Sequence, residues 1–499
     1  MTKLPEPLLE LIRPDEARPA LVCPDDGERV THTELRERAA AIAGRLRAAG
    51  VERGGRVAIV LPNGPEIVEV LLGVAAAGAA AAPLNPAYTE PEYRFYLDDL
   101  APQLLVVGAG AAPVARAAAD SIPVIEVAPR PGAEPLLTRE GAELPADRDG
   151  ADGAVDDVAL LLHTSGTTSR PKQVPLLQRN LTSQARSIAA HYALSADDVS
   201  YCAMPLFHVH GLVASTLAQL AAGGTVIVPR RFSPRRFWGQ AETHGVTWVS
   251  AGPTLHQMII DQPGTAPGTL RFTRSCSSAL SPRLMRDAEA RYGVPMIEAY
   301  GMTEAGHQMT SNPLPPAARL EGSVGVSAGA EIRVVDTEGR DVAPGAAGEV
   351  AIRGPGVTPG YLNNERANAE AFFDGWFRTG DEGTLEDGYL RLRGRLKEMI
   401  IRGGENISPH EIEAVLLAHP DVGEAVVFGV DDDKYGQTVA AAVVLTGSAG
   451  PDELRSHARK SLAAFKVPDA IHVLSEIPKT PTGKVQRSRM PAHLADGSS

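Results

Sequence analysis

The sequence predicts an α/β protein: a large N-terminal domain of layered α/β sheets plus a β subdomain, and a small α+β C-terminal domain. Three observations support this fold class. The chain has 499 residues, more than one hydrophobic core usually organises. Short apolar runs alternate with helix-like segments through the first part of the chain, which is typical of βαβ units with largely parallel sheets. After about residue 320, short β-type runs separated by Gly and Asp replace that alternation.

The alternation is visible from the first elements onward. Residues 31–49 predict an amphipathic helix, because Thr and Glu form a capping pattern at its start and Gly50 follows its end. A strand over 56–61 follows and is broken by Pro, Asn and Gly. Further short strands are expected at 103–107, 158–162, 225–228 and 247–249.

The later part divides into two. Short β runs at 331–336, 348–354 and 388–394 predict a β subdomain over about 321–396. The pattern then returns to α+β, with helix, strand, strand and helix between residues 411 and 462. We therefore expect an N-terminal domain over 1–396 and a C-terminal domain over 397–499, with a disordered tail at 495–499.

Composition excludes several classes of function. The net charge is -13 and no basic stripe with interleaved aromatics occurs, which argues against a nucleic-acid partner. Cys23, Cys202 and Cys276 are too widely spaced for a zinc site or a disulfide framework, and they favour a reducing compartment. The N-terminus lacks the apolar core of a signal peptide, and the apolar run 70–84 is too short to span a membrane. We expect a cytoplasmic protein.

The most informative motif is HTSGTTSRPK, which follows an apolar strand. Its small hydroxyl residues and Gly let backbone N–H groups and hydroxyls converge on phosphate oxygens, while Lys172 adds charge. The motif is not a Walker A loop, because no Gly-Lys-Ser/Thr ends it. The candidate phosphate ligands are Thr164, Ser165, Gly166, Thr167, Thr168 and Lys172.

This segment resembles the phosphate-binding loop of the superfamily of acyl-CoA synthetases, luciferases and adenylation domains. Four further motifs continue the resemblance in order along nearly the whole chain: MPLFHVHG, EAYGMTEAGH, WFRTGDEG with GRLKEMIIRGGENISPHEIE, and PKTPTGKVQR. The branch it looks most like is the oxalyl-CoA synthetase group, by HTSGTTSRPK and MTEAGHQMTSNPLP. The resemblance implies a ligase that joins a carboxylic acid to coenzyme A through acyl-AMP, using ATP and Mg²⁺ and releasing AMP and pyrophosphate.

The resemblance also implies roles for single residues. Glu304 would bind Mg²⁺, Thr303 would contact the α-phosphate, Tyr300 would stack on adenine, and Asp381 with Arg395 would bind the ribose. Lys484 would be the catalytic lysine of adenylation. The other catalytic residues would be Lys172, Thr303, Glu304 and His208. The remaining nucleotide contacts would be Ser277, Ser278, Ala279, Glu298, Ala299 and Gly301.

The family turns a mobile C-terminal domain between its two half-reactions, and Lys397 matches the hinge position. In the second state Gly403, Gly404 and Glu405 would line the tunnel for coenzyme A. The acyl pocket would be formed by His208, Gly252, Ser275, Met302 and His307. Gly252 and Gly306 stand where the resembled branch carries larger residues, so a bulkier acid has room unless these glycines only relieve backbone strain.

One departure from the family pattern leaves room for a different reaction. Gln173 follows Lys172, where the family usually has Gly, and its side chain would either fill the pyrophosphate space or point to solvent. In the first case the protein would run only the thioesterification half, on acyl-AMP from a separate adenylating enzyme. The sequence is also compatible with a freestanding enzyme that loads a carrier protein, with a luciferase-type oxygenase, and with a nucleotide-binding regulator without turnover.

Overall fold

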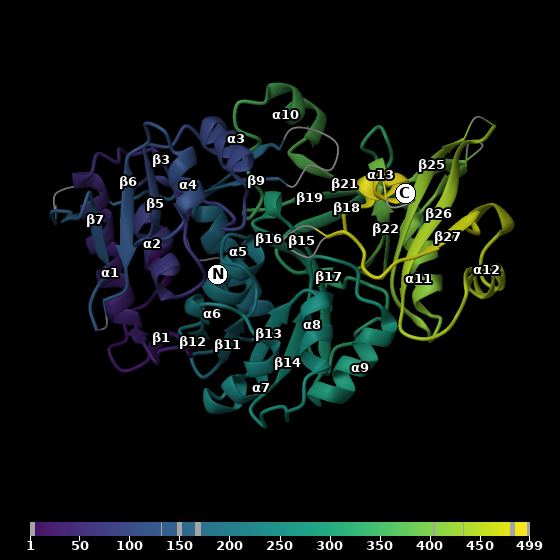
Figure 1. Cartoon of the computed structure of the whole chain (residues 1–499), viewed down its shortest axis with the longest axis horizontal. Helices are drawn as coiled ribbons and strands as arrows, with labels where there is room; N and C mark the ends of the chain where they lie inside the picture. The colour runs from purple at the N-terminus through teal and green to yellow at the C-terminus, as the bar shows by residue number, and fades with distance from the viewer. Residues whose placement is uncertain are drawn as a thin grey trace.

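The protein is described by a computed structural model that covers residues 5–130, 132–146, 152–164, 171–402, 405–432, 434–479 and 485–496. The described residues form four sheets (Figure 1): two large sheets with their helices, a small sheet beside them, and a C-terminal sheet at the far end. This is the predicted α/β architecture, so the fold class is confirmed.

An eight-stranded sheet with a parallel centre contains the strands on both sides of the predicted phosphate loop. Its order is β10-β9-β4-β3-β5-β6-β7-β8, and β9 and β10 pair antiparallel at one edge. Its strands are β3 (Arg56–Val60), β4 (Ala80–Pro83), β5 (Leu104–Gly108), β6 (Val124–Ala128), β7 (Leu136–Arg139), β8 (Ala142–Glu143), β9 (Val158–His163) and β10 (Gln173–Leu177).

The helices around this sheet are α1 (His32–Ala48), α2 (Pro65–Ala76), α3 (Glu90–Leu100), α4 (Pro113–Ala118) and α5 (Gln178–His191). Helix α1 starts with the expected capping box between Thr31 and Glu34. Every residue of α2 is buried, which explains its nearly continuous apolar sequence. Gly73 of α2 lets α1 approach closely, because an added Cβ would lie 2.5 Å from Ile42. These helices pack around the sheet whose strands β9 and β10 flank the predicted phosphate loop.

A nine-stranded sheet lies next to it and contains most of the remaining candidate residues. Its order is β17-β16-β15-β14-β13-β11-β12-β1-β2. Its strands are β1 (Pro19–Val22), β2 (Arg29–Thr31), β11 (Val199–Cys202), β12 (Thr225–Ile227), β13 (Trp248–Ala251), β14 (Phe272–Ser275), β15 (Met296–Met302), β16 (His307–Ser311) and β17 (Val326–Ser327). Its helical segments are η2 (His210–Leu217), which is π-helical, α6 (Ala218–Ala221), α7 (Pro234–Thr243), α8 (Pro253–Ile260), α9 (Pro282–Tyr292) and η3 (Thr303–Ala305).

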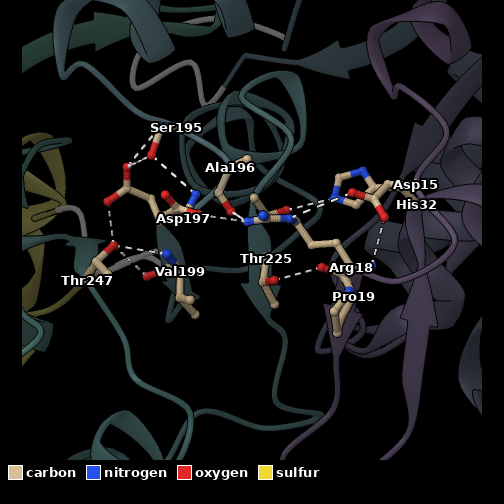
Figure 2. Close-up of polar contacts among 12 residues, drawn as sticks. Asp15, Arg18, Pro19, His32, Ser195, Ala196, Asp197, Val199, Thr225 and Thr247 are labelled. Carbon is tan, nitrogen blue, oxygen red and sulfur yellow. Dashed lines mark hydrogen bonds and ion pairs between the residues drawn. The ribbon is translucent and has the colours of Figure 1, made fainter.

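The N-terminal segment reaches this second sheet across a long stretch of sequence. Figure 2 shows the polar contacts there: Arg18 donates to the carbonyl of Ala196, and the hydroxyl of Thr225 donates to Pro19 O at 2.7 Å. Strand β1 pairs parallel with β12 and antiparallel with β2, so β2 forms one edge of the sheet. The order of strands in this sheet could not be read from local sequence patterns.

The small sheet and the C-terminal sheet follow. The first contains β18 (Glu331–Val335), β19 (Ala347–Arg353), β20 (Phe372–Phe373), β21 (Trp376–Glu386) and β22 (Tyr389–Arg395). Helix α10 (Glu365–Ala371) directly precedes β20. The second contains β23 (Ile400–Arg402), β24 (Glu405–Ile407), β25 (Val422–Asp432), β26 (Gly436–Leu445) and β27 (Ala470–Val473). Three α-helices accompany the latter, α11 (Pro409–Leu417), α12 (Pro451–Arg459) and α13 (Met490–Asp496).

The C-terminal sheet has its own hydrophobic core, which is formed by residues between Ile400 and Ile471. The predicted domain boundary at 396–397 falls in η4 (Leu396–Glu398), between β22 and β23. The movement of the C-terminal domain stays a prediction. Across the described ranges, no helix has the length and apolar character needed to cross a membrane.

Candidate active site

The base of the predicted phosphate loop is closed by two hydrogen bonds. Thr164 directly follows β9 and Lys172 directly precedes β10. The backbone N–H of Thr164 donates to Lys172 O at 2.9 Å, and the N–H of Lys172 donates to Thr164 Oγ1 at 3.1 Å. The loop therefore begins and ends at one point at the edge of the sheet. The other predicted loop ligands, Ser165, Gly166, Thr167 and Thr168, lie outside the described residues.

Lys172 and Glu304, predicted to act on phosphate and on Mg²⁺, meet at one tyrosine. Lys172 Nζ lies 4.4 Å from the ring centroid of Tyr361, and the Tyr361 hydroxyl donates to Glu304 Oε1 at 2.9 Å. Glu304 is 7% exposed, and its own backbone carbonyl accepts from the N–H of Thr358 at 2.7 Å. Burial, with the Glu304 carboxylate, raises the pKa of Tyr361, so this hydroxyl remains a donor. A cation and a carboxylate thus contact the same tyrosine side chain, one at its ring and one at its hydroxyl.

The predicted adenine and ribose residues also form one group. The Tyr300 hydroxyl donates to Asp381 Oδ2, and Arg395 Nε lies 2.8 Å from Asp381 Oδ1. The pairing of β21 with β22 places Asp381 opposite Arg395. Burial raises the pKa of Asp381, while Arg395 and the Tyr300 hydroxyl oppose that shift. The carboxylate predicted to bind ribose is therefore fixed by the tyrosine predicted to stack on adenine.

The turn after β14 carries the predicted contacts Ser277, Ser278 and Ala279, and Glu298 holds it. Glu298 Oε1 accepts from the N–H of Leu280 at 3.2 Å, and burial raises the Glu298 pKa to about 7. Ser277 has a φ of 78°, in the left-handed region, and is half-buried, while Ser278 and Ala279 are exposed.

The strand opposite this turn has no space for a side chain at Gly301. Here an added Cβ would lie 2.1 Å from His307 O. Ala299, two residues earlier on β15, is buried at 4% exposure. Steric constraint therefore explains the glycine at position 301, because β15 and β16 approach too closely there for a Cβ atom.

A buried arginine lies beside the predicted acyl pocket. Arg274 of β14 is 0% exposed. Its guanidinium donates to Ser250 Oγ at 2.8 Å, to the Tyr192 hydroxyl at 2.9 Å and to Gln308 Oε1 at 3.0 Å. Within the described ranges, no hydrogen-bond or ion-pair partner of Arg274 is a carboxylate. A guanidinium buried among neutral groups leaves its charge uncompensated.

Two histidines lie against this guanidinium. His210 Nε2 lies 2.7 Å from Ser250 Oγ, and His210 Nδ1 lies 2.9 Å from Ser277 Oγ. The rings of His210 and His307 are 4.9 Å apart, and His307 Nδ1 lies 3.4 Å from Arg274 Nη2. The cluster thus joins His307 and Ser277, which the sequence predicted, to His210 and Arg274, which it did not.

The direction of these hydrogen bonds follows from the arginine. A guanidinium can only donate, and Arg274 Nη1 lies 2.8 Å from Ser250 Oγ and 3.4 Å from His210 Nε2, so this ring nitrogen is placed as an acceptor. His210 Nδ1 then carries the hydrogen that is donated to Ser277 Oγ. Burial lowers the pKa of His210 well below its usual value, and the neighbouring His307 and Arg274 lower it further, so the ring is neutral at pH 7. The aligned dipoles carry positive potential from Arg274 to Ser277.

The other predicted pocket residues are placed less uniformly. His208 is half-buried, with its ring 4.9 Å from that of Phe207. Met302 and Thr303 are half-buried at the start of η3. Ser275 is wholly buried, and it alternates with Arg274 along β14, so its side chain faces the other side of the sheet.

The two predicted space-making glycines differ. At Gly252 an added Cβ would meet only Cys276 O, at 3.7 Å, so room exists. Gly306 has a φ of +64°, and an added Cβ would lie 3.2 Å from Gln184 and 3.3 Å from Gly356 O. Glycine at position 306 is therefore explained by its positive φ. Of these two positions, only Gly252 leaves the predicted space for a larger substrate.

The side chain of Gln173 points toward α3 and not into solvent. It is 8% exposed, and its Nε2 donates to Asp99 O at 2.6 Å and to Asp99 Oδ2 at 2.7 Å. Asp99 lies at the C-terminal end of α3. The hypothesis of a thioesterification-only enzyme, which depended on Gln173 occupying the pyrophosphate space, gains no support from this position.

The predicted hinge and tunnel lie at the junction with the C-terminal sheet. Lys397 is exposed within η4, directly after β22. Gly394 has a φ of +145°, and the Ser408 hydroxyl donates to Arg393 O, which connects α11 to β22. Glu405 is exposed on β24. Gly403, Gly404 and the predicted catalytic Lys484 lie outside the described residues.

Several residues of the site had only weak signals in the sequence. His210 stands two residues after His208 in HVHG, and Arg274 precedes Ser275, so both lie beside predicted site residues but were not selected. Tyr361 and Asp99 belong to no recognised motif, because their role depends on how distant segments pack.

Comparison with known proteins identifies the family of the chain. A family model described as AMP-binding enzyme matches residues 12–362, and one described as AMP-binding enzyme C-terminal domain matches residues 411–484. An oxalate–CoA ligase from Arabidopsis thaliana is 43% identical, over 94% of each chain. A sulfoacetate–CoA ligase from Cupriavidus necator is 38% identical, over 95% of each chain. ATP-bound MatB from Rhodopseudomonas palustris superposes with a TM-score of 0.89, at 29% identity and 99% coverage of both chains.

The family models span the phosphate-loop region, the acyl-pocket motifs and the C-terminal segment, and the relatives are named as ligases of acids with coenzyme A. The resemblance seen in the sequence is therefore confirmed. The chain belongs to the AMP-binding enzyme family and is an acid–CoA ligase that works through an acyl-AMP intermediate.

Proposed function

We propose that the acid activated by this ligase carries a second anionic group, which binds beside His210, His307 and Ser277. The observation that carries this proposal is Arg274, a wholly buried guanidinium whose partners are all neutral in the described part of the chain. An anion in the pocket compensates that charge. Because the guanidinium is enclosed, it acts on the substrate through the oriented His210 and Ser277 and through His307.

The relatives support the same class of substrate. Oxalate and sulfoacetate, for which two of them are named, are both small acids, with a second carboxylate and a sulfonate respectively. The open space at Gly252 would admit an acid with more atoms than oxalate. Within this class the proposal therefore covers short acids with a terminal carboxylate or sulfonate.

The test compares acids that differ only in the second anion. Pyrophosphate release is measured with sulfoacetate, oxalate, acetate and ferulate. We expect kcat/KM for sulfoacetate or oxalate to exceed that for acetate by about 100-fold or more, since a site built around buried polar groups rejects analogues that leave them unpaired. Equal or better turnover of acetate or ferulate contradicts the proposal.

Two variants tie the selectivity to the cluster. Arg274→Met removes the charge at similar length, and His210→Gln keeps hydrogen bonding while breaking the oriented chain. Both should reduce the preference for sulfoacetate over acetate by at least about tenfold. His210→Gln keeps the test decisive if Arg274→Met is unstable. An unchanged preference in folded His210→Gln overturns the proposed subsite.

The cofactors of the reaction are ATP, Mg²⁺ and coenzyme A, and the residues present fit them. Among the residues that the structure describes, no three metal-binding side chains cluster. A single buried carboxylate at Glu304 suits Mg²⁺, which is often held by one or two carboxylates with phosphates and water. On this proposal Thr164 and Lys172 contact phosphates, Asp381 the ribose, and Lys484 the forming acyl phosphate. Mg²⁺ supplies charge neutralisation at the phosphates.

The partners of the proposed reaction are the carboxylic acid and coenzyme A. A separate adenylating enzyme or a carrier protein is not required. A cytoplasmic location is part of the proposal and is supported by the three cysteines, which all carry free, buried thiols.

A further inference from the structure

The side chain of Gln173 joins the phosphate loop to helix α3. Its amide donates twice to Asp99, once to the backbone carbonyl and once to the carboxylate. The opposite orientation of the amide would place its oxygen against this carboxylate, so the donor assignment is the favourable one. Gln173 Oε1 has no partner among the described residues, which is the cost of placing an amide here.

The strand on the other side of the loop reaches the same carboxylate. His163 ends β9 and is in register with Gln173 on β10. Its Nε2 lies 3.0 Å from Asp99 Oδ2, and its ring packs edge-on against Tyr96 of α3 at 4.8 Å. Both strands that lead into the loop are therefore tied to Asp99, one residue below the Thr164–Lys172 hydrogen bonds.

The backbone of Gln173 faces the other half of the nucleotide site. Its carbonyl accepts from the N–H of Leu362 at 3.0 Å. The neighbour of Leu362 is Tyr361, whose ring contacts Lys172 and whose hydroxyl binds Glu304. Gln173 thus connects α3, the loop base and the segment that orients Lys172 and Glu304.

We propose that Gln173 is a positioning residue for ATP: it clamps the base of the phosphate loop to Asp99 and so sets the positions of Thr164 and Lys172. The inference rests on the proposed phosphate role of this loop. Replacing Gln173 by glycine, the residue usual in the resembled family, removes the amide that donates to two acceptors on Asp99, one of them charged. The loop base then loses its attachment to α3 on one side.

The experiment separates the two half-reactions. Gln173→Gly and Gln173→Met are compared with wild type in ATP-dependent pyrophosphate release and in acyl-CoA formation from synthetic acyl-AMP. We expect KM for ATP to rise about tenfold, the effect of losing hydrogen bonds to a charged group. Acyl-CoA formation from acyl-AMP should change less than about twofold, because the β- and γ-phosphates take no part in it. Gln173→Met preserves volume and guards against a simple packing defect.

A double-mutant cycle assigns the effect to Asp99. Asp99→Ala alone should raise KM for ATP similarly, and the double variant Asp99→Ala with Gln173→Met should be no worse than either single variant. Equal losses in both half-reactions would indicate a general structural role and overturn the inference, as would an unchanged KM for ATP in Gln173→Gly.

Lys172→Ala distinguishes this inference from the proposed loop function. If Lys172→Ala impairs pyrophosphate release while the Gln173 and Asp99 variants match wild type, the loop role stands and the clamp is wrong. If Lys172→Ala is also unaffected, the proposed phosphate role itself is wrong.

Discussion

The predicted nucleotide half and the predicted acyl half of the site bury opposite charges. Among the predicted nucleotide contacts that the structure describes, the buried charged side chains are acids: Glu298, Glu304 and Asp381. Each has a donor, from Leu280 N–H, Tyr361 and Tyr300 respectively, and Asp381 also has Arg395. On the acyl side the buried charge is the cation Arg274, among neutral serines, histidines, an amide and a tyrosine.

This difference shows which half depends on its ligand for charge balance. The acids of the predicted nucleotide half are already hydrogen-bonded, and the cations proposed to meet ATP there, Mg²⁺ and Lys172, would add to a satisfied arrangement. The acyl half keeps a charge that neither its serines nor its histidines neutralise. We infer that recognition in the acyl half is mainly electrostatic, whereas recognition in the nucleotide half depends on geometry.

The largest effect is expected from a substitution that impairs only the predicted nucleotide half of the site. Glu304→Gln removes the carboxylate proposed for Mg²⁺, so pyrophosphate release should fall about 100-fold, the usual scale for losing one electrostatic group at a reacting centre. Higher Mg²⁺ concentration should recover part of the loss. The measurement is a magnesium titration of pyrophosphate release.

The control for Glu304 is Tyr361→Phe, which keeps the ring under Lys172 and removes only the hydroxyl. One lost hydrogen bond predicts about a fivefold effect. If Glu304→Gln slows acyl-CoA formation from acyl-AMP as much as it slows pyrophosphate release, its role is structural and the comparison fails.

Local patterns predicted the elements better than the connections between them. The capped helix α1 and the strands at 56–60 and 158–163 follow from capping chemistry and apolar runs, which act over a few residues. Strand order was beyond such patterns: β1 pairs with β12 some 200 residues later, by hydrogen bonds whose partners are not encoded locally.

The site shows the same division. Motifs predicted roles for Glu304, Tyr300 and Asp381, and the structure places the latter two in contact. Arg274 was not selected, because one Arg in a strand normally indicates an exposed residue and its burial depends on α5, η2 and β16 together. Gln173 was noticed as a departure, but its partner Asp99 lies 74 residues earlier, so its direction needed the fold.

A smaller effect, on the pH dependence of stability, tests whether the histidines near Arg274 are neutral. His256 lies beside Arg274, with Nε2 2.9 Å from Arg274 O, and burial lowers its pKa to about 4. In the unfolded chain its pKa returns to about 6.5, so below that pH the unfolded state binds a proton that the folded state does not. Stability is therefore full above pH 6.5 and falls as the pH decreases toward 4.

Urea unfolding at pH 7.5 and pH 5.5 measures this. His256 alone should account for about 1.4 kcal/mol of the loss in the free energy of unfolding between these values. His256→Gln should flatten the pH dependence by that amount, even if it lowers stability at pH 7.5. His210, whose pKa is lowered further, adds a loss in the same direction. An identical pH slope in wild type and His256→Gln would show that this ring is already charged at pH 5.5.

The smallest expected effect tests whether the acyl half can be altered without disturbing the nucleotide half. Gly252→Ala adds a methyl group where only Cys276 O lies within 4 Å, at 3.7 Å, so the fold should lose less than about 0.5 kcal/mol. Because Gly252 is predicted to line the acyl pocket, KM for the acid should change by a few-fold while KM for ATP stays constant.

Gly301→Ala is the matched contrast, because its Cβ would lie 2.1 Å from His307 O and force β15 and β16 apart, at a cost of about 1–3 kcal/mol. A change in KM for ATP in Gly252→Ala, without a change for the acid, would mean that this glycine belongs to the nucleotide half and that the two halves meet at α8.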